Sequence, residues 1–348
     1  MRKCKYKKIY SKGKKHPTHF QRRSFKEQCR KYNKYKKNKT KHINLSKSKN
    51  PYRNNPHNTN IDGIINFPKC INKLDQIIKD IKSRTGKYSI SINHKNLDEI
   101  DNTSILILTA SISDINSNIK TFIKNKKLKP KAEIDERLSA IGYWDALCIN
   151  HKTKNDNLDY LQIASHDGST TDNAFHIKIV NFVLEKTGLS EEYKDIFMDA
   201  VYEAMANTKE HAYNSKNKKI WLVGAYNGKE TEIIFYDIGM GIFNSFQYSQ
   251  SWFAKFLKKC VKIIGRDKTL LALCTTDLSK YKKRDNSLRG LGMMVYKKLI
   301  DEISKERNAT LEIYTDNLCY STSKGNSKLS GKIKGTLIRW NIGEKDER

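Results

Sequence analysis

Long apolar runs are missing from this sequence of 348 residues. A helix needs roughly 20 consecutive apolar residues to cross a bilayer, and the most apolar stretch here, residues 105–110, is far too short. The N-terminus is basic, but no apolar segment follows its charges as it would in an export signal. We therefore expect no membrane partner and no export of the chain.

Closely spaced cysteine pairs are absent as well. The seven cysteines are odd in number and widely scattered, and none belongs to a Cys-x-x-Cys pair. Such a pattern argues against a disulfide framework and favours reduced thiols in a cytoplasmic protein. Cys4, His16, His19 and Cys29 could be drawn as a zinc set, but their spacing fits no compact zinc knuckle.

Acidic residues are almost absent from the first 60 positions. Residues 1–60 hold 21 Lys and Arg against one acid, Glu27, and so account for 20 of the 30 net positive charges. They also hold almost no aliphatic side chains, so they cannot bury enough apolar surface to offset the entropy of ordering. We interpret them as a disordered basic arm. Its interleaved Tyr and Phe suit base stacking, which makes RNA or single-stranded DNA one candidate partner; a solvated tail is the alternative.

Residues 61–150 have the pattern of a small α/β domain. Apolar residues recur at helical spacing over 70–81, and they alternate as in a strand over 88–92. A turn with Asp101, an apolar run and a helical segment ending near Gly142 follow. We therefore predict a domain boundary near residue 150.

The order of strand, Asp101 turn and apolar segment resembles the STAS-like domains related to anti-anti-sigma factors. In phosphorylated members of that family a serine directly follows the aspartate. Here Asn102 follows it, and Thr103 and Ser104 come next. The resemblance therefore implies a small interaction module without a phosphorylated serine at the usual position. An unrelated α/β domain is the alternative.

Residues 151–348 begin with two helical patterns, the second of which starts at Ser190. Serine is a favoured N-cap, and the two glutamates after it favour the helix dipole. In this second helix Glu203, Asn207 and His211 follow one another at four-residue steps, so they share one face. Apolar residues at three- and four-residue steps form another face, which is typical of a helix packed on a sheet.

An alternating pattern over residues 220–224 precedes Asn227-Gly228, the strongest short signal for a β-hairpin, and residues 231–236 return as a second strand. The second strand ends in the sequence Asp237-Ile-Gly-Met-Gly241. An acid at a strand end, followed by two glycines, lets the backbone approach a flat or anionic ligand. The third glycine of a dinucleotide-binding loop is absent, because Asn244 stands in its place.

A second glycine-rich segment, Arg289-Gly-Leu-Gly292, stands directly before an amphipathic helix. Backbone amides at a helix N-terminus, together with a guanidinium group, suit a phosphate. Two further strands are expected after this helix, and Gly335-Thr336 precedes the last of them.

Taken in order, these segments resemble the motifs of the GHKL ATPases, the family of gyrase, Hsp90, histidine kinases and MutL. The anti-sigma-factor kinase branch is the most similar. Residues 203–212 match the asparagine box EAxxNxxxHA, residues 237–241 the DxGxG box, residues 289–292 the RGLG box and residues 335–336 the final GT. The resemblance implies an α/β fold: a two-layer sandwich of the Bergerat type with a mixed, mostly antiparallel sheet, preceded by the smaller α/β domain and the arm.

The same resemblance implies roles for single residues. Asn207 would ligate the Mg²⁺ that bridges the phosphates of ATP, and Asp237 would accept a hydrogen bond from the adenine amino group. Glu203 occupies the position of a general base toward water or a hydroxyl group. The role of His211 is not implied. Further nucleotide contacts would come from Gly239, Gly241, Arg289, Gly290, Leu291, Gly292 and Thr336.

Three functions are compatible with these motifs. The first is a slowly hydrolysing, nucleotide-dependent switch that reports to an unknown protein partner, with a homodimer left open. The second is a serine/threonine protein kinase of the anti-sigma type, with Glu203 as the base. The third is a nucleic-acid-binding protein with a regulatory ATP site. A histidine autokinase is disfavoured, because no upstream histidine stands on a long amphipathic helix before an acid.

Overall fold

The fold is described from a computed structural model. Its contacts divide the chain into two units, residues 1–55 and 56–348, and all described residues belong to the second. The predicted arm therefore lies outside the described residues, apart from its last four positions, which form strand β1 (His57–Asn60). The structure describes residues 57–84, 90–118, 130–147, 159–167, 173–208, 219–248, 252–276 and 292–345.

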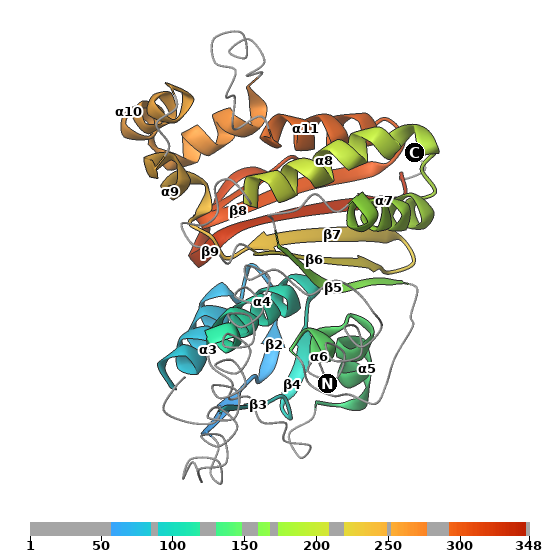
Figure 1. Cartoon of the computed structure of the whole chain (residues 1–348), viewed down its shortest axis with the longest axis vertical. Coiled ribbons are helices and arrows are strands. Elements are labelled where there is room, and N and C mark those ends of the chain that lie inside the picture. Colours follow the sequence, from blue (N-terminus) through green and yellow to red (C-terminus); the bar gives the residue numbers. More distant parts are fainter. Residues whose placement is uncertain are drawn as a thin grey trace, which may run out of the picture. The chain divides into compact units, whose positions relative to one another are not determined.

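A five-stranded sheet forms the centre of the second unit (Figure 1). Its strand order is β5-β6-β7-β9-β8, and every neighbouring pair is antiparallel. The predicted hairpin is confirmed: β6 and β7 are joined at Asn227, whose side-chain oxygen accepts hydrogen bonds from the amides of Lys229 and Glu230. The strands are β5 (Tyr160–Asp167), β6 (Lys219–Tyr226), β7 (Glu230–Asp237), β8 (Asn308–Ser321) and β9 (Gly325–Gly343).

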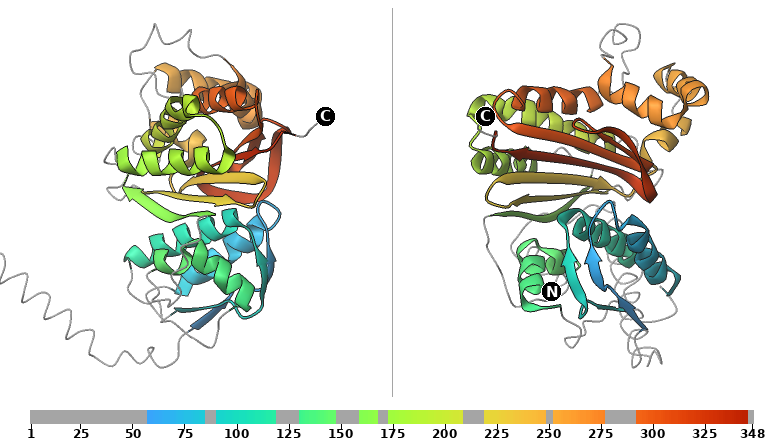
Figure 2. Two further views of the ribbon diagram at one scale, coloured as in Figure 1. Left: turned by 90° about the vertical axis from the view of Figure 1, so that its right-hand side faces the viewer. Right: turned by 180° about the vertical axis from the view of Figure 1, so that it is seen from behind.

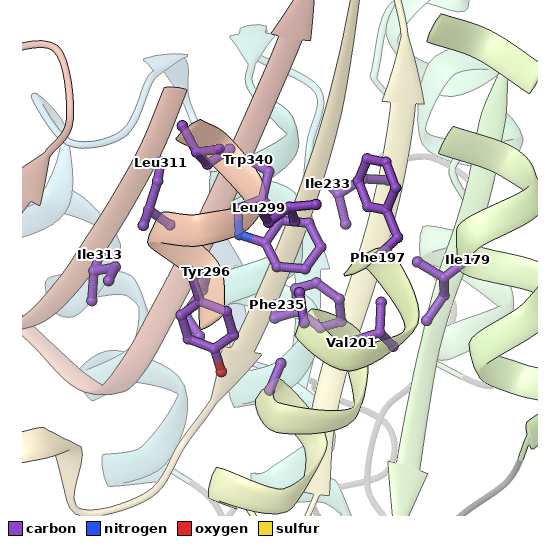
Figure 3. Close-up of a cluster of buried hydrophobic side chains, with 14 of the residues drawn as sticks. Ile179, Phe197, Val201, Ile233, Phe235, Tyr296, Leu299, Leu311, Ile313 and Trp340 are labelled. Carbon is purple, nitrogen blue, oxygen red and sulfur yellow. The ribbon is translucent and has the colours of Figure 1, made fainter. Parts of the chain in front are cut away.

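Helices α7 (Asn173–Thr187), α8 (Lys194–Asn207) and α11 (Gly292–Ile303) cover one face of this sheet, which we call the helical face (Figures 1 and 2). Their apolar sides and alternate residues of the strands form one buried cluster (Figure 3). Phe235 and Trp340 meet edge to face at its centre, 5.1 Å between ring centroids. Burial of each such large side chain contributes about 1.5–3 kcal/mol, so this cluster fixes the helices on the strands.

The start of α8 differs from the prediction. Ser190 makes no side-chain cap hydrogen bond, and its carbonyl instead accepts the amide of Tyr193 in a short 3₁₀ turn, Glu191–Tyr193. The α-helix proper begins only at Lys194. A 3₁₀ turn satisfies part of the unpaired N–H groups at a helix start, which removes the need for the serine side chain.

The opposite face of the sheet, here called the outer face, is covered by residues 57–147 (Figures 1 and 2). In this segment β1 pairs with β3 and β2 pairs with β4, both in parallel, and α3 crosses between them as in a βαβ unit. The remaining elements are β2 (Gly63–Ile65), α3 (Ile71–Arg84), β3 (Ile90–Asn93), β4 (Leu97–Ile100), α4 (Asn102–Asn118), α5 (Ala132–Ala140) and α6 (Tyr143–Ala146).

The strands are therefore apolar on both faces. In β7, Ile233 and Phe235 belong to the helical-face cluster, whereas Ile234 and Tyr236 belong to a second cluster shared with residues 57–147. A strand buried on both faces reads as a continuous apolar run. The chain is thus of the α/β class, with a five-stranded antiparallel sheet between two layers.

A charged network crosses the outer face. Arg339 of β9 donates to Glu312 of β8 through Nε at 2.7 Å, and its guanidinium lies 3.6 Å from Glu232 of β7. Asn102, at the start of α4, donates to Glu232 at 2.8 Å and accepts from Arg137 of α5 at 2.8 Å. Burial raises the pKa of Glu232, and the charge of Arg339 opposes that rise. This network ties both segments of the unit together.

Helices α9 (Gly241–Tyr248) and α10 (Trp252–Thr275) lie between β7 and α11 in the chain. Gly265, with φ 84°, interrupts α10 so that it consists of two helical halves. After the break, Arg266 pairs with Asp316 of β8, where the β8–β9 register shifts. No helix within the described part of the chain has the length and apolar character needed to cross a bilayer.

Candidate functional site

Helix α8 presents two of the predicted polar residues. Its buried Phe197, Val201 and Ala204 hold it on the sheet, and this fixes the direction of the neighbouring face. Glu203 and Asn207 lie one helical turn apart on that face and are half-buried. A carboxylate and a carboxamide therefore stand together at the C-terminal end of α8.

Helix α11 begins at Gly292, directly against these two side chains. A Cβ placed on Gly292 would lie less than 3.0 Å from Nδ2 of Asn207 and 3.2 Å from Oε2 of Glu203. A side chain at this position would displace the Asn207 carboxamide, so glycine lets the start of α11 lie directly on it. The N-terminus of a 12-residue helix, with its positive dipole end, thus faces the carboxamide and the carboxylate.

Tyr296, one turn further along α11, was not among the predicted site residues. Its hydroxyl accepts a hydrogen bond from Nδ2 of Asn207 at 3.1 Å. Its ring is fully buried near Trp340 (Figure 3). Burial raises the pKa of Tyr296, and the negative charges of Glu203 and Asp237 raise it further. The phenol therefore stays neutral and holds the Asn207 carboxamide in one orientation, within electrostatic range of both carboxylates.

Asp237 is the last residue of β7 and the next predicted site residue. It is buried, its Oδ1 accepts the amide of Gly239 at 2.8 Å, and Thr336 of β9 lies opposite it in the strand register. Burial raises its pKa to about 7, although the hydrogen bonds from Gly239 and Thr336 oppose this rise. Within the described ranges no ion pair neutralises Asp237, and such a buried carboxylate gains from any ligand that donates a hydrogen bond to it.

The strand ends around Asp237 are packed backbone to backbone. Gly335 has φ 83°, and a Cβ there would lie less than 3.0 Å from the carbonyl of Asp237 and the amide of Gly239, so only glycine fits. Thr315 of β8 accepts the amide of Ile242 at 3.1 Å and donates to the carbonyl of Gly335 at 3.3 Å. These contacts make the floor of the site rigid.

The structure brings together most, but not all, of the predicted residues. Glu203, Asn207 and Gly292 meet between α8 and α11, while the remaining described residues, Asp237, Gly239, Gly241 and Thr336, surround the ends of β7 and β9. The predicted residues that lie outside the described ranges are Arg289, Gly290, Leu291 and His211.

Two residues of the site were missed in the sequence. Tyr296 stands four positions after Gly292, so helical spacing alone places it on the same face, and this signal was available. Thr315 had no such signal, because its place beside Gly335 depends on the register of the β8–β9 pair, which shifts between Thr315 and Asp316.

A divalent cation fits this site only as part of a larger ligand. Within the described ranges, no group of three or more His, Cys, Asp or Glu side chains is placed to hold a metal ion. Asn207 offers a carboxamide oxygen, a ligand type that Mg²⁺ accepts, and Mg²⁺ commonly takes one protein ligand plus phosphate oxygens and water. The donor set therefore suits Mg²⁺ carried by a phosphate compound.

A scan against protein-family models finds no match to the chain, and neither does a search of curated proteins. The assignment of a function therefore depends on the geometry of the site itself.

Proposed function

We propose that the chain binds Mg·ATP as a GHKL-type, Bergerat-fold ATPase and acts as a slowly hydrolysing, nucleotide-dependent regulatory switch. One observation carries this proposal. Glu203 and Asn207 of α8 face the N-terminus of α11 at Gly292, while the buried Asp237 lies opposite Thr336 at the neighbouring strand ends. Tyr296 hydrogen-bonds Asn207 and lies within electrostatic range of Asp237. Such a site has one end for a hydrogen-bonding base and another for phosphates.

The adenine would lie at the Asp237 end. The carboxylate of Asp237 is an acceptor for the exocyclic amino group, and a guanine base would present a carbonyl oxygen at that position instead. A buried acceptor left without its donor costs about 1–3 kcal/mol, so the site should discriminate against GTP. The hydroxyl of Thr336, opposite Asp237 in the register, adds a second polar group beside the base.

The phosphates would lie at the Gly292 end. Amides at the N-terminus of α11 suit phosphate oxygens, and Asn207 would hold the Mg²⁺, which supplies charge neutralisation of the phosphates when bound. Because Gly292 packs directly on Asn207, phosphates can enter only if the first turn of α11 draws away from α8. This displacement would be the basis of the switch.

Glu203 would act as the base toward water. It lies one turn from Asn207 on the same helix face, and its Oε2 points to the α11 N-terminus, where the terminal phosphate would be. Thr103 and Ser104 are both buried at the start of α4. They are therefore inaccessible as phosphate acceptors in this arrangement.

The test is calorimetric titration of the full chain with Mg·ATP, together with an assay of phosphate release. We expect Asp237→Asn and Asn207→Ala to lose ATP affinity at least tenfold, and Glu203→Gln to bind ATP but release no phosphate. Asp301→Asn, at an exposed carboxylate of α11 paired with Lys297, is the matched control and should behave as wild type. A wild-type protein that binds no adenine nucleotide, or binds GTP equally well, would overturn the proposal.

A further inference from the structure

The first half of α10 exposes large apolar side chains. Ile263 is 80% exposed, Ile264 41% and Phe256 37%. Phe256, the half-buried Cys260 and Ile263 follow one another at steps of four and three residues, so they form one stripe along the helix. Steps of four and three are the spacing of a seam that packs against another helix.

The opposite side of the same half-helix is already occupied. Ala254 and Leu257 are buried, and Val261 packs against the helical-face cluster. The stripe of Phe256 and Ile263 therefore points away from the core. Figures 1 and 2 show α10 projecting past the end of the sheet.

Lysines line one edge of the stripe. Lys255, Lys259 and Lys262 are all exposed and follow one another at steps of four and three residues, so they form a parallel row. The sequence from Trp252 to Arg266 contains no acidic residue. The surface thus combines an apolar seam with a row of positive charges.

The second half of α10, after Gly265, is anchored to the rest of the unit. Arg266 pairs with Asp316 and lies over the ring of Phe243, and Leu270 and Leu273 are buried. The exposed stripe therefore lies directly before a segment of the helix that is packed on the unit.

We infer that this face of α10 docks an acidic amphipathic helix of a partner protein. Apolar residues of that helix would pack on Phe256 and Ile263, and its flanking carboxylates would pair with the lysine row. A nucleic acid would use the lysines and leave Ile263 in water. A second copy of α10 would bring like charges together, which is unfavourable. The inference is independent of ATP binding.

The experiment uses fluorescence anisotropy with the full chain and a labelled designed peptide. The seam probe has three heptads with Leu at the a and d positions and Glu at e and g. A scrambled peptide of the same composition measures binding that depends on charge alone, including binding to residues 1–60. The seam probe should bind at least tenfold more tightly than the scrambled peptide at about 150 mM salt.

Two pairs of variants test the face itself. Ile263→Ser should lower the affinity for the seam probe about tenfold, because Ile263 would become buried in the complex and its burial contributes strongly to binding. Ile64→Ser is the matched control, because Ile64 of β2 is also exposed, at 54%. The double variant Lys255→Glu, Lys259→Glu should bind a probe with Lys at e and g more tightly than the seam probe with Glu at these positions. Lys229→Glu, in the β6–β7 turn, should leave the preference for the seam probe unchanged.

The inference is overturned if the seam and scrambled probes bind equally, or if Ile263→Ser and Ile64→Ser have the same effect. It is also overturned if single-stranded RNA competes fully with the seam probe and binds Ile263→Ser as tightly as wild type, since the face would then be a purely electrostatic surface.

Discussion

Replacement of Asp237 by asparagine should make the protein more stable at alkaline pH. The pKa of this carboxyl rises from an ordinary value of 3.8 to about 7 because it is buried. The unfolded chain therefore releases the proton at lower pH than the folded protein, so stability is lost as the pH rises from about 4 to about 7. The loss at high pH corresponds to about 4 kcal/mol.

Asparagine carries no charge to bury, so Asp237→Asn removes this loss. The amide keeps one oxygen to accept the Gly239 N–H but turns the other acceptor into a donor toward Thr336, at a cost of about 1–2 kcal/mol. The variant should therefore be about 2 kcal/mol more stable than wild type at pH 8.5 and no more stable at pH 4.

Urea unfolding followed by circular dichroism at both pH values measures this difference, with Asp301→Asn as the control. A variant that is equally destabilised at pH 4 and pH 8.5 would refute the reasoning, because the ionised Asp237 would then be satisfied within the fold. In wild type, ATP affinity should fall as the pH drops below about 7, because the protonated carboxyl is a weaker acceptor for the adenine amino group than the carboxylate is.

Further predictions concern the α8–α11 contact and the outer face. Gly292→Ala should favour the arrangement in which the first turn of α11 stands away from α8, because its Cβ meets the carboxamide of Asn207, and should therefore bind Mg·ATP severalfold more tightly than wild type, whereas Gly343→Ala, which meets only the flexible side chain of Glu230, should bind ATP as wild type does in the same titration. Tyr296→Phe should cost about 1 kcal/mol in urea unfolding and weaken the Mg²⁺ dependence of ATP binding, since Asn207 loses the acceptor that orients it. Arg339→Met should destabilise the fold by about 3 kcal/mol in the same unfolding assay, because the buried Glu312 and the half-buried Glu232 lose their counter-charge.

Local features of the fold were predictable from the sequence. The helix α8, predicted from its three- and four-residue apolar spacing, and the Asn227-Gly228 turn both depend on residues that are close together in the chain. Both are confirmed. The polar face of α8 was predicted to place Glu203 and Asn207 on one side for the same reason.

Features that depend on distant residues were not predictable in this way. The close approach of Gly292 to Asn207 and the hydroxyl of Thr315 beside Gly335 arise only when separate elements pack. The apolar run in β7 predicts a strand, but its burial on both faces arises only when residues far away in the chain pack against the sheet. The predicted boundary at residue 150 stays a prediction.

The double burial of the sheet has a consequence for how the second unit can unfold and evolve. Trp221, Tyr236 and Leu337 of the outer face are buried in the cluster shared with residues 57–147. If that segment were removed, the sheet would expose a contiguous apolar surface of the kind that promotes aggregation. We therefore expect residues 57–345 to melt in one cooperative transition, and substitutions on the outer face of the sheet to be compensated by changes in α4 rather than tolerated separately.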